Sequence, residues 1–508
     1  MWGRIAAIPA WATLAGLVAV STALRAWAGS LVPTPWILPD EVVYTELGRS
    51  LYHSGSFEIL GEPTRFYSLV YPALVGLPLS MSDLQLGYTL LKALQALVMS
   101  LTAIPVYLWS RTLTSRGWAL AAAALTLSVP GLAYSGLVMT EVAFYPLAAL
   151  AAWAIARALA RPTRAAQALA AGAVLLASAT RLQGVVLAAV FVTAAALKAV
   201  FERSARPAAQ LWPTYGAFAL AGVGWVAWRL AQGGPASELF GAYRAAGEVH
   251  YSFSDSVLYA RWHFADVLLM TGVVPVLAVA VLAIRAFAGH ERSAEARAYL
   301  AVAVSLTAWL VVEVGVFASR HVGRLAERDL LALVPVLFVG FGLWLGRGAP
   351  RPRLTSLAVA LGGLALVLAL PVGRLVSLAA IPDAFTLIPL YRLQVRAPAV
   401  DLQLLVDLFA AAAVAAFLLV PRRLRLGLPL VIGLFLALAS ISASRVVTAQ
   451  ATIVRKTAVG DEKRWIDPAA GGPVTYLYSG EVRWDSVWEG LFWNRKATRQ
   501  SRRSGTYC

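Results

Sequence analysis

The sequence predicts an all-α polytopic membrane protein with about 13 transmembrane helices and a small C-terminal α/β tail. Of its 508 residues, 59% are hydrophobic and only 14% are charged, whereas soluble domains carry roughly a quarter charged residues. The mean hydropathy is +0.70. Apolar runs of about 20 residues, the length that crosses a bilayer, recur along most of the chain. These observations exclude a water-soluble globule of this size.

The apolar windows place the individual spans. The predicted spans are 5–28, 86–110, 118–138, 142–159, 165–179, 182–200, 211–230, 267–287, 299–318, 330–345, 354–372, 402–420 and 424–444. The first of them resembles a signal peptide, with Arg4 before an apolar run and small residues after it. Because that run is longer than a usual signal core and many spans follow, a retained signal-anchor helix is predicted.

Loop charges orient these spans. The chain has 43 Lys and Arg against 26 Asp and Glu, and the basic residues gather in alternate short loops, as the orientation of membrane proteins requires. This places the N-terminus in the cytoplasm and the C-terminal tail outside it, in the inner membrane of a bacterial cell. No basic–aromatic tract accompanies the charge, so no nucleic-acid partner is expected. Cys508 is the only cysteine, which excludes an internal disulfide.

Two regions are predicted: a transmembrane module at 1–444, with a first outer loop at 29–85, and an extracytoplasmic tail at 445–508. The tail holds a strand-like alternation at 473–479 after a Gly-Gly turn signal. About 60 residues is marginal for an independent domain. Its last residues, 495–508, are basic and lack apolar periodicity, so we expect a small or truncated domain with a disordered end.

The first outer loop carries the richest chemistry. A helix is predicted at 42–52, because Val43, Leu47 and Leu51 recur at four-residue spacing and would face the membrane. Asp40 fits the N-cap of this helix and Glu41 its first turn, and one interpretation is that both only stabilise the helix end. The other is that an acid at the outer membrane surface meets the phosphate of a lipid-linked substrate.

Pro39-Asp40-Glu41 with Tyr44 and Glu46, after one span and before a loop that ends in Tyr71-Pro72 and a second short helix, resembles the first loop of GT-C glycosyltransferases. The protein O-mannosyltransferases and lipid A aminoarabinose transferases are the most similar groups. The resemblance covers roughly residues 1–200 by motif and the rest through span architecture. It implies a GT-C-like bundle and an inverting transferase. The implied donor is a polyprenyl-phosphate sugar, and the implied acceptor is a hydroxyl of an envelope glycan, lipid or protein.

The resemblance also implies roles for loop residues. Asp40 would act as general base on the acceptor hydroxyl, and Glu41 would be a supporting or metal-linked carboxylate; a base paired with stabilisation of the leaving phosphate is sound chemistry. Tyr44 is a candidate substrate-binding residue. The aminoarabinose transferases carry a lysine before the proline pair of this loop, where this chain has Arg65-Phe66-Tyr67-Ser68. Arg65 and Tyr67 are therefore substrate-binding candidates, and the acceptor stays open.

Two further candidates lie at outer ends of spans. Glu141 opens the fourth span, where the resemblance implies a donor contact or, with Glu41, a divalent metal such as Mg or Mn. The alternative is an ordinary acid at a helix start, capped by Thr140. Arg181 sits between two short apolar segments, where a charge is costly without a partner. It is predicted either to bind the donor phosphate or to extend to the membrane interface.

A basic cluster occupies an expected outer loop, where the orienting rule does not require it. Arg320, Arg324 and Arg328 recur every four residues and would form one stripe if helical. Donor phosphate binding is one explanation. The other is internal pairing with the nearby acids Glu313, Glu327 and Asp329. His263, where the second long outer loop meets a span, is a candidate substrate contact or a hydrogen-bonded interfacial residue.

Two other function classes fit the composition: a transporter or flippase for a lipid-linked saccharide, and a polysaccharide polymerase or ligase. Transporters tend to show repeats and charges at mid-membrane. Here most acids and arginines lie at predicted outer ends and no repeat is visible. A polymerase or ligase would carry its catalytic loop later in the chain. The long first outer loop therefore favours the glycosyltransferase.

Overall fold

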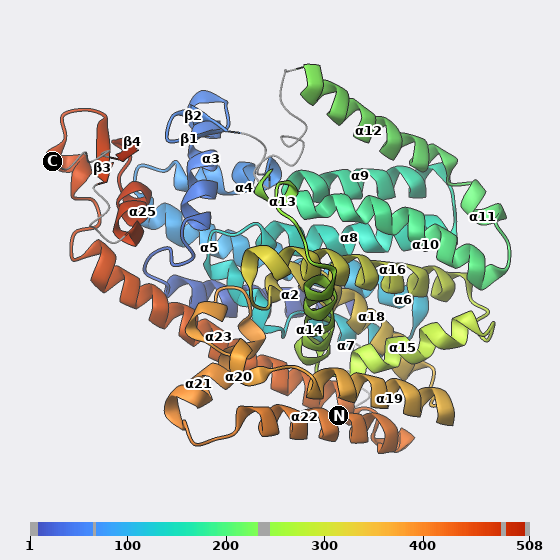
Figure 1. The fold of residues 1–508 in the computed structure, drawn as a ribbon. Coiled ribbons are helices and arrows are strands. Elements are labelled where there is room, and N and C mark those ends of the chain that lie inside the picture. The colour runs from blue at the N-terminus through green and yellow to red at the C-terminus, as the bar shows by residue number, and fades with distance from the viewer. Residues whose placement is uncertain (1–8, 65–67, 232–243, 479–483, 503–508) are drawn as a thin grey trace. The chain divides into compact units, whose positions relative to one another are not determined.

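The computed structural model describes residues 9–64, 68–231, 244–478 and 484–502, and helices dominate it (Figure 1). Within these residues, seven helices are long and apolar enough to cross a bilayer, or up to nine if each of two bent helix pairs counts as one span. Three shorter apolar helices accompany them. The prediction of an all-α polytopic membrane protein is confirmed. The count of 13 spans is not.

The elements follow the predicted spans in order. The first half of the chain contains α2 (Ala10–Ser30), α3 (Asp40–Ser54), α4 (Val70–Leu79), α5 (Leu84–Ser100), α6 (Ala103–Leu113), α7 (Arg116–Thr126), η1 (Pro130–Gly136), α8 (Glu141–Ala160), α9 (Arg164–Thr180), η2 (Leu182–Val185), α10 (Val186–Glu202), α11 (Arg206–Ala209) and α12 (Trp212–Ala231). The second half contains α13 (Arg244–Gly247), α14 (Phe253–Thr271), α15 (Val274–Phe287), α16 (Ala294–Phe317), η4 (Ala318–Val322), α17 (Glu327–Leu330), α18 (Leu333–Gly346), α19 (Arg353–Leu368), α20 (Val372–Leu375), α21 (Ile388–Arg396), α22 (Leu402–Leu419), α23 (Gly427–Val454), η8 (Arg455–Val459), α24 (Ile466–Ala469) and α25 (Trp484–Trp493).

Two predicted spans are not single helices. The span at 118–138 covers α7 and η1, which are bent by 56° relative to each other, and the span at 267–287 is the second case. The apolar window at 267–287 is not a single helix, because α14 and α15 meet there at a bend of 112°. Gly272 ends α14 with φ of 78°, and Val273 follows with φ of 67°. Two successive residues with positive φ cannot continue a right-handed helix. The residues before 267, expected in a loop, therefore belong to α14, and the hydrophobic window straddles the bend.

The described chain forms two compact units built from separated stretches. Unit 1 comprises Met1–Ala19, Ser100–Gly131 and Phe144–Ser442. Unit 2 comprises Val20–Met99, Leu132–Ala143 and Ala443–Cys508. The C-terminal tail thus belongs to the same unit as the first outer loop. The predicted boundary between a transmembrane domain at 1–444 and a tail domain at 445–508 stays a prediction.

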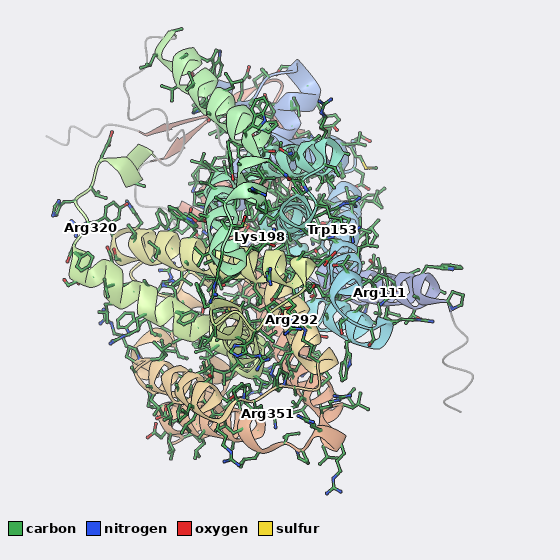
Figure 2. All side chains as sticks on the ribbon, turned by 90° about the vertical axis from the view of Figure 1, so that its right-hand side faces the viewer. Arg111, Trp153, Lys198, Arg292, Arg320 and Arg351 are labelled. Carbon is green, nitrogen blue, oxygen red and sulfur yellow. The ribbon has the colours of Figure 1, made fainter. Side chains whose placement is uncertain are left out.

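Unit 1 is a helix bundle in which α16 packs against α10 and α14, α15 packs against α18, and α19 packs against α22 (Figure 1). Several contacts join loops that are predicted to be cytoplasmic, and Figure 2 labels Arg111, Lys198, Arg292 and Arg351 from these loops. Arg161 pairs with Glu295 at 2.9 Å, and Arg347 pairs with Glu291. Arg351 donates to the carbonyl oxygen of Val420 at 2.6 Å. These contacts agree with the alternation of loop charges, which requires the predicted inner loops to share one side.

Unit 2 is organised around α3, which crosses α4 at two glycines. A Cβ atom on Gly48 would lie 3.0 Å from the Cα atom of Gly76, so a larger residue would push the helices apart. In the tail, α25 packs against α3, and β3 (Val474–Tyr478) pairs in parallel with β4 (Ala497–Arg502). The predicted strand is confirmed as β3. The expectation of disorder from residue 495 is wrong for 497–502, which complete this sheet. A second, antiparallel pair joins β1 (Glu58–Ile59) to β2 (Glu62–Pro63).

Candidate functional site

Asp40 is the first residue of α3. The predicted N-cap role is wrong, because Pro39 occupies that position and makes no side-chain capping bond. The backbone is already helical at Pro39, with φ of −85° and ψ of −5°, so the helical turn starts one residue earlier than the capping pattern implies. The Asp40 side chain lies half-buried at the beginning of the helix.

Glu41, the next residue, is fully buried and binds backbone. Its Oε1 accepts hydrogen bonds from the N–H groups of Trp36 at 2.6 Å and Ile37 at 2.7 Å. Its Oε2 accepts one from the N–H of Val138 at 2.9 Å. Burial raises the pKa of Glu41 to about 7, although the three N–H groups and the charge of Lys92 act to lower it. This carboxylate ties the chain before α3 to the 132–143 segment and so positions Asp40.

The surroundings of Glu41 do not suit a divalent metal. Both of its oxygens already face N–H donors, and a cation would have to displace them. Glu141 is buried at the start of α8, with its Oε2 at 3.4 Å from the Thr140 hydroxyl. Among the residues that the structure describes, no three His, Cys, Asp or Glu side chains gather as a metal site would require. A requirement for Mg or Mn stays a prediction.

Two buried ionisable side chains of unit 2 are not among the residues predicted from the sequence. Lys92 of α5 donates to the carbonyl oxygen of Val32 and lies 3.6 Å from the ring centroid of Tyr88. Glu489 of α25 accepts hydrogen bonds from Thr34 and, at 3.1 Å, from the indole N–H of Trp493. A lysine inside an apolar window was the available signal, since a charge within a span marks a polar partner.

The other loop candidates differ in how they are placed. Tyr44 is buried and meets Tyr71 edge-on, with ring centroids 5.5 Å apart. Tyr71 in turn donates to the side-chain oxygen of Gln95. Tyr44 therefore helps to pack α3 on α4, and its contact with substrate stays a prediction. Arg65 and Tyr67 lie outside the described residues.

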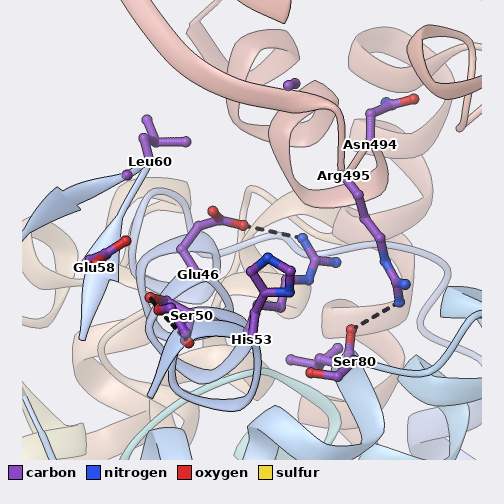
Figure 3. Close-up of a pocket in the computed structure, with 13 residues that line it drawn as sticks. Glu46, Ser50, His53, Glu58, Leu60, Ser80, Asn494 and Arg495 are labelled. Atoms are coloured by element: carbon purple, nitrogen blue, oxygen red, sulfur yellow. Dashed lines mark hydrogen bonds and ion pairs between the residues drawn. The ribbon is translucent and has the colours of Figure 1, made fainter. Parts of the chain in front are cut away.

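A polar cavity of about 460 Å³ lies on α3, within unit 2 (Figure 3). Glu46, Arg49, Ser50 and His53 face it and share one side of the helix, roughly half a turn around the axis from Asp40. Glu46 and Arg49 form an ion pair at 3.2 Å, and burial raises the pKa of Glu46. Arg495 from the tail completes the wall. The volume of this cavity is in the range of small-molecule sites, about 300–1,000 Å³. Its lining offers both hydrogen-bond donors and acceptors, which suits a ligand rich in hydroxyl groups.

Four of the arginine candidates lie in unit 1, and acids hold three of them. Arg181, at the break between α9 and η2, pairs with Asp329. Arg324 and Arg328 both pair with Asp383, with Arg324 Nε at 2.7 Å and Arg328 Nε at 3.2 Å from its oxygens. Asp383 lies 59 residues after Arg324 and 55 after Arg328, which is why loop spacing alone did not suggest it.

The three regularly spaced arginines do not form one stripe. Arg320 lies in the π-helical turn η4, which ends at Gly323 with φ of 68°, and α17 begins only at Glu327. The glycine interrupts the helical repeat on which the stripe depended. Internal pairing therefore holds for Arg324 and Arg328, but with Asp383 rather than with the nearer acids. Arg320 is exposed.

His263 of α14 is buried and has backbone partners on both ring nitrogens. Nδ1 lies 2.7 Å from the carbonyl oxygen of Tyr259, and Nε2 accepts the N–H of Ala326 at 2.9 Å. Because Nε2 accepts, the ring proton belongs on Nδ1. This is the hydrogen-bonded alternative for His263, and it connects α14 to the loop before α17. Asp40 and Glu41 belong to unit 2, and these arginines and His263 belong to unit 1.

Neither a protein-family model nor a curated protein matches this chain by sequence. Solved structures are similar to it in fold. The crystal structure of ArnT from Cupriavidus metallidurans in the apo state is 16% identical and matches 94% of this chain and 84% of that chain, with a TM-score of 0.50. The structure of the same protein bound to undecaprenyl phosphate is 15% identical over 96% and 86%, with a TM-score of 0.47. At this identity the likeness establishes the fold alone: the chain is a polytopic membrane protein similar in fold to ArnT.

Proposed function

We propose that this protein is a membrane glycosyltransferase. It moves a single sugar from a polyprenyl-phosphate donor to an acceptor hydroxyl of an envelope glycan, lipid or protein, on the outer face of a bacterial inner membrane. The observation that carries the proposal is an aspartate at the start of a surface helix, with its backbone held by a buried glutamate, in a chain that shares the fold of ArnT.

In this reaction Asp40 is the general base. It takes the proton of the acceptor hydroxyl while the hydroxyl oxygen attacks the anomeric carbon of the sugar. The bond from that carbon to the phosphate oxygen breaks, and the phosphate leaves with the electron pair. Attack opposite the leaving group inverts the anomeric centre. A positioned base contributes typically 10²–10⁴-fold to such a step, provided that its geometry is held.

The departing phosphate needs positive charge, and the arginines of unit 1 are the candidates. Arg324 is the best of them because 36% of its side chain is exposed, although it contacts Asp383. Arg328 and Arg181 are more buried and pair with Asp383 and Asp329. Arg320, four residues before Arg324, is exposed and would add a further positive charge for the phosphate. Guanidinium groups suit phosphate through paired N–H donors.

The cavity on the reverse side of α3 lies away from Asp40, so it is the candidate site for a polar part of the acceptor remote from the hydroxyl that reacts. Glu46 and Glu58 supply hydrogen-bond acceptors, and Arg49 and Arg495 supply donors. Both signs of charge are represented, so a ligand with many hydroxyl groups can use all of them without carrying a charge itself. His53 and three serines extend the same surface.

The test is sugar transfer by the purified protein in liposomes, with a panel of polyprenyl-phosphate sugars and candidate acceptors. Asp40→Asn should reduce transfer at least 100-fold while its melting temperature stays that of the natural protein. Glu62→Gln removes an exposed acid of the same loop and is the matched control, which should transfer normally. Normal transfer by Asp40→Asn would refute the base assignment. Movement of a lipid-linked saccharide across the bilayer without transfer would favour the flippase.

A further inference from the structure

A groove of about 360 Å³ runs between α21 and α23, within unit 1. From α21 it is lined by Arg392 and Arg396, and from α23 by Phe435, Leu438, Ala439 and Ser442. The α23 residues follow the spacing i, i+3, i+4, i+7, so they form a single face of that helix. Arg392 and Arg396 are likewise one turn apart on one face of α21. The groove is therefore built by two helix faces turned toward each other.

Its charge is positive. Side chains four residues apart on a helix are neighbours, with Cβ atoms roughly 5–6 Å apart, so two guanidinium groups can share one phosphate. Arg392 Nη1 donates to the hydroxyl of Ser442 at 2.9 Å, across the groove. This arginine consequently reaches toward α23 instead of extending along the surface. The described residues that line the groove include no acid.

The remainder of the lining is apolar. Phe435 stacks on Phe409 of α22, with centroids 4.8 Å apart. Leu434 and Leu438 are 62% and 58% exposed, on a helix long and apolar enough to cross a membrane. Such an exposed surface on a spanning helix faces hydrocarbon chains, so the groove is open to the bilayer. Basic side chains above an apolar groove match a lipid that carries a phosphate.

We propose that this groove binds an anionic phospholipid of the surrounding bilayer. Arg392 and Arg396 hold its phosphate, and Phe435 and Leu438 contact the start of an acyl chain. The volume lies near the lower end of ligand pockets, about 300–1,000 Å³, which fits a headgroup with part of a chain. The proposal does not depend on sugar transfer, because no lining side chain can act as a base there. It also accounts for the arginines of α21, which lies between the predicted spans 354–372 and 402–420. The alternation of loops places this segment outside the cytoplasm, where orientation does not require basic residues.

The test uses the full chain in nanodiscs of phosphatidylcholine, with and without phosphatidylglycerol, together with native mass spectrometry of bound lipid. Phosphatidylglycerol should raise the melting temperature and remain bound. The amount of phosphatidylglycerol that stays bound to the double variant R392A/R396A should be at least about tenfold lower, as expected when charged hydrogen bonds are lost. The matched control is R422A/R423A, which removes two exposed arginines from another loop of unit 1 and should bind as the natural protein does.

Several outcomes would overturn the proposal. Equal loss in R422A/R423A would mean unspecific attraction of anionic lipid. Preferential retention of undecaprenyl phosphate would assign the groove to the donor lipid, and full displacement by inorganic phosphate would mean that no lipid chain is recognised. If R392A/R396A does not fold, R392K/R396K replaces it, because this variant keeps both positive charges. It should bind phosphatidylglycerol several-fold more weakly than the natural protein, because lysine lacks the planar guanidinium group with its paired N–H donors. Unchanged retention in R392K/R396K would then refute the phosphate contact.

Discussion

The two units stabilise their conspicuous charges in opposite ways. In unit 2 the buried acid Glu41 is satisfied by backbone N–H groups from two separate segments. In unit 1 the arginines at 181, 324 and 328 are satisfied by the side chains of Asp329 and Asp383. Backbone donors cannot move without moving the chain, whereas paired side chains can separate while both helices stay in place. The comparison indicates a rigid support for Asp40 and an arginine cluster that can exchange a carboxylate for a phosphate.

The largest expected effect comes from removing the rigid support. Glu41→Leu leaves three buried N–H groups without an acceptor, and each such loss costs about 1–3 kcal/mol. We expect unit 2 to fail to fold or to melt far below the natural protein. Glu41→Gln keeps one acceptor oxygen and should be milder. Thermal unfolding and proteolysis of the first loop measure both variants. A Glu41→Leu protein as stable as the natural one would remove the contrast between the units.

Asp383→Ala tests the arginine cluster. It leaves Arg324 and Arg328 without their shared carboxylate, and breaking a buried ion pair costs about 3–5 kcal/mol. Because Arg324 is partly exposed, we expect the lower end of that range. Arg324→Ala in the same protein should recover part of the loss, since the stranded charge is gone. A double-mutant cycle measures this coupling, and strictly additive effects would show that the pair contributes nothing.

Below about pH 8 the buried carboxyls of unit 2 should give a pH dependence reversed from that of an ordinary salt-bridged protein. Lys463, whose pKa burial lowers to about 8, acts in the opposite sense at higher pH. Burial raises the pKa of Glu489 from 4.5 to about 8, and that of Glu41 to about 7. The folded state then holds protons that the unfolded state releases, so this contribution to stability is present below about pH 4.5 and declines as the pH rises to 8. Melting temperatures between pH 5 and 8.5 measure it. Glu489→Gln cannot ionise and should flatten the profile; an unchanged slope would contradict the assignment.

The smallest effect is expected at Arg320. Its side chain is exposed in η4, so Arg320→Ala should change the free energy of unfolding by no more than about 0.5 kcal/mol. Any role that it has must therefore appear as weaker use of the lipid-linked donor at unchanged stability. A Michaelis constant for the donor measures this. Loss of stability instead would mean that Arg320 is a structural residue like its neighbours.

Much of the first outer loop was predictable from the sequence because its signals are local. The four-residue spacing of Val43, Leu47 and Leu51 marks α3, and Pro39-Asp40-Glu41 marks its start. The expectation that these apolar residues face the membrane is wrong for Leu47, which is 1% exposed and therefore buried by other parts of the protein. The error at Asp40 is one residue, since capping depends on the backbone angles of Pro39, which no spacing reveals. Lys92 was missed although a charge inside an apolar window is a signal. Its partner, the carbonyl oxygen of Val32, gives no signal at all.

By itself the sequence determined the membrane class, the order of the apolar segments and the alternation of their loops, since these depend on composition and on the cost of burying charge in lipid. Only the tertiary structure decided the partners: Val138 for Glu41, Asp383 for Arg324 and Arg328, and Ala326 for His263. It also decided the bend at Gly272 and Val273 inside a continuous apolar window. Hydrophobicity depends on each side chain and its near neighbours. A hydrogen bond between distant segments depends on where the whole chain brings its donors and acceptors.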